Sequence, residues 1–193
     1  VYEINQPLIL KFMAQSALLD PEGASPIIPN LTNDQATKVI AAATWTTFVS
    51  PEGPYTPFYH YNAGTFDSNQ LPTNLVYSNY NYLLQYVLNL ANYQSRKEVV
   101  ELEAMLSGAE DLPYDDNLKN IKIPVFYVGA AGGEGNYAKY TLSLLGSVDK
   151  RSLIVGFYNP ENAFADFGHL DLRTAENAKT LVWEPILYWI RNH

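Results

Sequence analysis

The chain has 193 residues, 47% of them hydrophobic, which is enough to bury the core of one domain with an accessory subdomain. Its formal net charge is −8 and no basic cluster is longer than a pair such as Arg96–Lys97, so we expect no nucleic-acid partner. Because cysteine is absent, disulfides, thiolate nucleophiles and Cys-ligated metals are excluded.

The apolar runs are all too short for a membrane span, and we expect none. The sequence begins VYEINQPL without a methionine, which we interpret as a processed product. This interpretation favours secretion but leaves the compartment open.

Three stretches in the first part of the chain are predicted to be helical. Residues 32–48 begin with Thr32 and carry Gln35 three positions later, which is the pattern of a capping box. Residues 80–93 and 95–108 follow the same helical spacing of apolar side chains.

Long connections separate these helices. Residues 50–74 are rich in Pro, Gly and Tyr, and His60 within them is interpreted as a surface loop histidine. Helices without a sheet make a poor isolated fold, so residues 1–118 are predicted to form a helical cap laid over another unit. Many of the fifteen tyrosines and eight phenylalanines lie in this cap, where they either roof an apolar pocket or simply pack between helices.

The second part of the chain, residues 119–193, differs from the first in containing long apolar runs. Residues 123–131 and 152–158 are unbroken apolar runs, typical of strands buried on both faces of a parallel sheet. Apolar side chains at helical spacing lie between them, from Tyr137 to Leu145. We therefore predict a strand, a crossover helix and a parallel strand, which places the chain in the α/β class.

A final helix is predicted over residues 174–193. Thr174 is the expected N-cap, and Pro185 should kink the helix because proline lacks an N–H and crowds the preceding turn. The loop before this helix reads DFGHLDL, residues 166–172, and contains His169.

His169 has two possible roles. A histidine after the last strand of an α/β sheet lies at the carboxyl edge where substrates bind, and there it can act as a general acid and base. Alternatively, it packs in a polar loop and bonds a backbone carbonyl. Asp166 and Asp171 flank it and are expected to shape its loop through side-chain bonds to the backbone.

The order of strand, loop, helix, strand, FGHLDL and closing helix resembles the C-terminal part of the α/β-hydrolase family, notably its lipases and esterases. The resemblance covers about residues 121–193. It implies the C-terminal portion of an α/β-hydrolase fold, with His169 as the catalytic base and the preceding residues as a cap. It also implies that the acid lies just after the first of the two strands.

Glu134 is the only carboxylate in that position, within GAAGGEG. Aspartate is the commoner acid of the family, so glutamate is a departure. Glu134 is either the triad acid that orients the imidazole or a surface side chain in a glycine-rich turn. The three histidines show no metal-ligand spacing, so neither a metal nor another cofactor is expected.

No serine in this sequence has glycines at both minus two and plus two, so the nucleophile elbow of the family is absent. We therefore expect a fragment or subunit of a serine hydrolase that acts on small apolar esters, completed by an N-terminal fragment or companion chain that carries the nucleophile. Two alternatives stay open: a non-catalytic binding or assembly subunit that keeps the fold, and a non-esterase with a different nucleophile.

Overall fold

The structure is a computed structural model, and it describes residues 2–3, 5–43, 59–91, 94–95, 100, 115–133 and 135–193. Within these residues the chain is a mixed α/β protein. Its elements are β1 (Tyr2–Glu3), α1 (Asn5–Leu19), α2 (Asn33–Ala42), β2 (Gly64–Phe66), β3 (Pro72–Leu75), α4 (Tyr80–Leu88), β4 (Gln94–Ser95), a 3-10 helix (Asp115–Asn120), β5 (Val125–Ala130), α6 (Ala138–Leu144), β6 (Lys150–Val155), a second 3-10 helix (Pro160–Ala165), α7 (Asp171–Thr174), a π-helical turn (Lys179–Trp183) and α8 (Glu184–Arg191).

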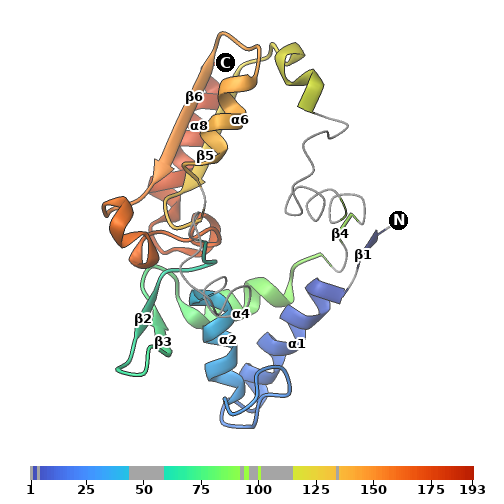
Figure 1. The fold of residues 1–193 in the computed structure, drawn as a ribbon, viewed down its shortest axis with the longest axis vertical. Coiled ribbons are helices and arrows are strands. Elements are labelled where there is room, and N and C mark those ends of the chain that lie inside the picture. Colours follow the sequence, from blue (N-terminus) through green and yellow to red (C-terminus); the bar gives the residue numbers. More distant parts are fainter. Residues whose placement is uncertain are drawn as a thin grey trace.

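Two groups of elements lie at opposite ends of the view in Figure 1. Helices α1, α2 and α4 pack together at the bottom with the β2–β3 hairpin, whereas β5, β6, α6 and α8 form the upper left part. The loops at the carboxyl ends of β5 and β6 point from the upper group towards the lower one. His169 lies in the loops between them.

The predicted strand–helix–strand unit is confirmed. Strands β5 and β6 pair in parallel with a continuous register from Val125↔Lys150 to Ala130↔Val155, and α6 lies between them in the sequence. The small residues that end β5 and begin the next loop let the chain turn tightly there: Gly133 N and Gly135 N both donate to the carbonyl of Ala130.

The predicted capping box at the start of α2 is also confirmed. Thr32 Oγ1 accepts from the N–H of Gln35, and Gln35 Oε1 accepts from the N–H of Thr32, which satisfies two donors of the first turn. Helix α4 begins at Tyr80 as expected, with Asn79 as its cap. The predicted helix over residues 95–108 lies almost wholly outside the described residues.

The expectation of a cap without strands was wrong. Strands β2 and β3 form an antiparallel hairpin inside the stretch interpreted as a long loop. The turn is held by the Asp67 carboxylate, which accepts from the N–H groups of Asn69 and Leu71, and by Gln70 in the left-handed region with φ 61°. Short strands separated by a side-chain-bonded turn carry little apolar periodicity, so the sequence pattern did not indicate them.

Thr174 does not cap the final helix, contrary to the prediction. It is the last residue of α7. Its hydroxyl donates to the carbonyl of Leu170 and hydrogen-bonds the hydroxyl of Ser78, so it does not bond the N–H groups of the final helix. The kink expected at Pro185 corresponds to a change of helix type, because a π-helical turn precedes α8 and Pro185 occupies the first turn of α8.

The upper core consists of residues from the strand ends and from the segment leading into α8. The buried members are Ala130, Val155, Phe167, Ala175, Ala178 and Val182. Phe167, fully buried, comes from the His169 loop and stacks at 5.1 Å from the ring of Tyr77. The loop is therefore anchored in the core two residues before its histidine.

Candidate functional site

His169 lies where the loops that follow β5 and β6 meet. The N–H of Gly132, just after β5, donates to the carbonyl of Phe167 at 2.9 Å. A Cβ added to Gly133 would lie 2.8 Å from the backbone N of His169 and 3.1 Å from its Cβ. The predicted position of His169 at the carboxyl edge of the parallel pair is therefore confirmed.

The backbone of His169 is fixed while its ring stays half-buried. Its N–H donates to the carbonyl of His60 at 3.0 Å, and the next N–H, of Leu170, donates to the carbonyl of Tyr61 at 2.6 Å. The imidazole lies 5.7 Å from the ring of Tyr59 in a tilted arrangement. Residues 59–61, more than 100 positions earlier in the sequence, therefore lie alongside the loop and hold His169 in place.

Burial lowers the pKa of the His169 imidazole below its ordinary value of 6.5, and the charge of Arg173 lowers it further. The ring is therefore neutral at pH 7. A neutral imidazole has one nitrogen free to accept a proton, as a general base requires.

His60 is not on the surface, contrary to its interpretation as an exposed loop residue. Its side chain is fully buried, and Nε2 donates to the carbonyl of Asp166 at 2.7 Å. The N–H of His60 donates to the carbonyl of Gly132 at 3.0 Å. Burial lowers the pKa of His60, against the opposing effects of the Asp166 bond and of the carboxylates of Asp171 and Asp166.

Two glycines make room for the His60 ring. A Cβ on Gly132 would lie 2.5 Å from its Cε1 and Nε2, and a Cβ on Gly168 would lie 2.7 Å from its Cδ2. His60 therefore fills the space between the loop after β5 and the loop of His169.

The two aspartates that flank His169 shape its loop, as predicted. Asp166 is buried and accepts from the N–H groups of Phe157, Tyr158 and its own neighbour Phe167, at 2.7 to 3.1 Å. These bonds close the turn between β6 and the histidine.

Asp171 connects the loop to the hairpin segment. Its carboxylate, fully buried, accepts from Gly168 N, Ala63 N, Asn62 Nδ2 and Ser78 Oγ at 2.6 to 2.9 Å. A buried charge is tolerated when it is hydrogen-bonded this fully.

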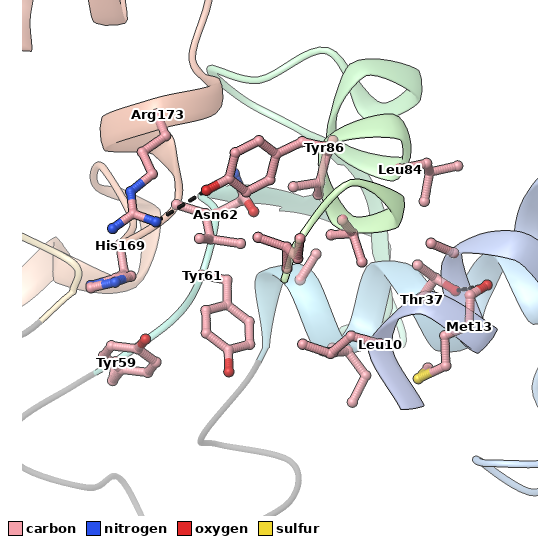
Figure 2. A pocket seen from close by; sticks show the side chains of 17 residues that line it. Leu10, Met13, Thr37, Tyr59, Tyr61, Asn62, Leu84, Tyr86, His169 and Arg173 are labelled. Atoms are coloured by element: carbon pink, nitrogen blue, oxygen red, sulfur yellow. Dashed lines mark hydrogen bonds between the residues drawn. The ribbon is translucent and has the colours of Figure 1, made fainter. Parts of the chain in front are cut away.

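A cavity of about 250 Å³ opens beside His169 (Figure 2). Most of its wall is apolar and comes from α1, α2 and α4, including Met13, Ile40 and Leu84. Tyr59, Tyr61 and His169 line the end nearest the loop. Its volume is just below the roughly 300 Å³ at which drug-sized pockets begin, so it fits a small ligand.

Arg173, one helical turn after His169, lies at the same end of the cavity (Figure 2). Its Nη1 donates to the hydroxyl of Tyr86 on α4 at 3.1 Å. Among the described residues no carboxylate forms an ion pair with this guanidinium. It is a cation at the rim of a mostly apolar cavity.

Glu134, the predicted acid, lies outside the described residues, although it directly follows Gly133 in the sequence. Within the described part of the chain, no carboxylate and no serine hydroxyl hydrogen-bonds the His169 imidazole. The same part holds no cluster of metal-ligating side chains. None of its helices combines the length and apolar character needed to cross a bilayer.

No family model, curated protein or solved structure matches this chain. The site therefore has to be interpreted from its own geometry. Sequence reasoning placed His169 correctly but missed His60 and Arg173. The sequence spacing could have indicated Arg173. It lies four residues after His169, and in a helical turn residues four apart lie on the same face.

Proposed function

We propose that this chain supplies the general base, and part of the substrate cavity, of a serine hydrolase that cleaves small apolar esters. In this proposal, residues 119–193 are the C-terminal portion of an α/β-hydrolase fold and residues 1–118 form its cap. The observation that carries the proposal is a neutral, half-buried His169 at the carboxyl edge of a parallel strand pair, beside an apolar cavity.

In the proposed reaction a serine hydroxyl attacks the ester carbonyl carbon, and the His169 imidazole takes its proton. The resulting imidazolium gives the proton to the departing alkoxide, which leaves as the alcohol, and an acyl-enzyme remains. Water then attacks the acyl-enzyme with the same proton relay and releases the carboxylic acid. The fixed backbone of His169 supports this role, because proton transfer depends on a held donor–acceptor geometry.

Glu134 is the proposed orienter of the imidazole. Support comes from the preceding residue, Gly133, which lies against the backbone of His169. A carboxylate that accepts the other imidazole N–H would set the tautomer and stabilise the imidazolium.

The nucleophile is proposed to come from a companion polypeptide or a preceding segment. Strands β5 and β6 pair only with each other in the described part of the chain. Both were expected to be buried on two faces, yet Phe126, Tyr127 and Val128 are only half-buried, and Ile123 nearby is 70% exposed. Further strands alongside the pair would cover this apolar surface.

The test uses this chain together with any polypeptide that co-purifies with it. We expect a fluorophosphonate probe to label a serine on the companion, and the assembly to hydrolyse a short p-nitrophenyl ester. His169→Gln should lower kcat by about 10²- to 10⁴-fold while the assembly stays intact. His193→Gln is the matched control, since His193 stacks on Trp189 and lines no part of the cavity.

Unchanged hydrolysis in His169→Gln would remove this residue from the mechanism. An assembly that is intact but hydrolyses no ester and takes no label would favour a non-catalytic binding subunit. A label on a serine of this chain would show that the nucleophile was assigned to the wrong polypeptide.

A further inference from the structure

The rim of the cavity beside His169 carries a positive charge that the proposed ester hydrolysis does not use. Arg173 and His169 both line this end of the cavity, while the far walls come from apolar side chains of α1, α2 and α4 (Figure 2). A wholly apolar ligand would leave the guanidinium facing the ligand without a negative partner. The pairing of an apolar wall with a cationic rim is suited to an amphipathic anion.

We propose that the cavity binds a small apolar carboxylate, with its hydrocarbon part between α1, α2 and α4 and its carboxylate on the guanidinium of Arg173. The guanidinium has five N–H donors, and its one hydrogen bond to a described side chain is that from Nη1 to Tyr86 Oη. Donors remain for a bidentate contact with a carboxylate, which matches the planar fork of arginine.

Tyr86 supports this geometry. Its hydroxyl, on α4, accepts the bond from Arg173, so the exposed guanidinium is tied to a residue of the cavity wall at the solvent-facing rim. An arginine that is already held loses less conformational freedom when a ligand binds. The other charged groups of the loop, Asp166 and Asp171, are buried and saturated with hydrogen bonds, so they compete little for it.

The hydrocarbon part has room for a short chain. The walls that would contact it include Leu10, Met13 and Ala14 of α1, Ile40 and Ala41 of α2, and Leu83, Leu84 and Val87 of α4. Each additional CH₂ buried there should raise affinity about fourfold, until the cavity is full.

Binding can be measured on the full chain without any hydrolysis. We would titrate it with butanoate, hexanoate and octanoate, and with 1-octanol as the uncharged match, by calorimetry and by the NMR signal of the His169 Cε1 proton. We expect affinity to increase with chain length, octanoate to bind more tightly than 1-octanol, and the His169 signal to shift on binding.

Arg173→Gln should weaken octanoate binding roughly tenfold and leave 1-octanol binding unchanged, because only the charged hydrogen bonds are lost. Arg173→Lys should retain part of the preference, since it keeps the charge without the fork. Arg191→Gln is the control, as Arg191 is exposed in the last turn of α8 and lines no part of the cavity. Equal affinities for acid and alcohol in the unaltered chain, or an equal loss in Arg191→Gln, would overturn the proposal.

The bound carboxylate has two possible sources: the acid released by the proposed hydrolysis, or a second acidic group of the substrate. Only the choice between these two sources rests on the proposed function. In an active assembly, Arg173→Gln should weaken inhibition by octanoate if the product binds there. It should raise KM for a half-ester of a dicarboxylic acid, and not for ethyl octanoate, if a substrate acid binds there. His169→Gln should lower kcat by about 10²- to 10⁴-fold yet still bind octanoate, so the two proposals fail separately.

Discussion

The backbone N–H of His169 donates to the carbonyl of His60, and the His60 side chain donates in turn to the carbonyl of Asp166. One buried histidine therefore holds the loop of the other at two points.

His60→Ala should destabilise the protein by about 2–4 kcal/mol, because it leaves a cavity between two loops and a buried carbonyl of Asp166 without its donor. Urea unfolding measures the change. His193→Ala serves as the control and should cost less than about 1 kcal/mol, since the described contacts of its ring are with Trp189, four residues away, and with the partly exposed carboxylate of Asp149. Equal losses in the two variants would contradict the structural role of His60.

Asp171→Asn should cost about 2–4 kcal/mol, because one of the two acceptor oxygens becomes an NH₂ group that faces donors. Thermal unfolding measures this loss. Glu176→Gln, an exposed carboxylate in the following turn, should change stability by less than about 0.5 kcal/mol. If the Asp171 variant were as stable as the unaltered protein, the hydrogen-bonded carboxylate would not be what connects the loop to the hairpin segment.

Gly133→Ala should displace the His169 loop, since its Cβ would lie within about 3 Å of the backbone of His169. We expect chemical shifts of residues 168–170 to change, and ester hydrolysis by the active assembly to fall more than tenfold. Gly23→Ala is the matched control, because the closest atoms there belong to the side chain of Asp20, which can rotate away. Full activity in the Gly133 variant would mean that the loop tolerates the shift.

Arg173→Gln should raise the pKa of His169, because the positive charge of Arg173 lowers it in the unaltered protein. An NMR titration of the imidazole Cε1 protons follows His60 and His169 in one experiment. His60 is the internal control, since Arg173 is not among the charges that act on it, and its titration should stay in place. An unchanged His169 midpoint would place Arg173 too far from the imidazole.

The free energy of unfolding should fall as the pH drops from about 7 to 5. Burial lowers the pKa of both His60 and His169 in the folded state, whereas the unfolded chain takes up protons near 6.5. Above that pH neither state binds these protons, and below it the unfolded state binds more, so stability is lost. Urea unfolding at several pH values tests this, and a free energy that stayed level from pH 7 to 5 would contradict the lowered pKa values.

The parallel strand pair and the position of His169 could be predicted because their signals are local. A continuous apolar run indicates a strand, and a helical spacing between two such runs indicates a crossover. The expected burial of both strand faces was wrong for the described residues, since β5 is only half-buried over most of its length. The capping box of Thr32 and Gln35 is local in the same sense, because both partners lie within one turn. The correct predictions are those in which the interacting residues are close in sequence or share a period.

His60 could not be placed in this way, because its burial depends on Gly132, Gly168 and Asp166, which are distant in sequence. A histidine among tyrosines and prolines looks like a loop residue until its partners are known. Thr174 was assigned to the wrong helix end for a similar reason, since its hydroxyl is bonded across the fold to Ser78. Polar residues whose partners come from another segment carry no periodic signal.

The link from His60 Nε2 to the carbonyl of Asp166 spans 106 positions of the chain, and this separation bears on how the protein is made. Helices such as α2 and α4 can form as soon as they leave the ribosome, but His60 must wait for its acceptor until the 106 residues up to Asp166 have also been synthesised. Closing so large a loop is slow compared with helix formation, so the loop of His169 should reach its final position later than α2 and α4.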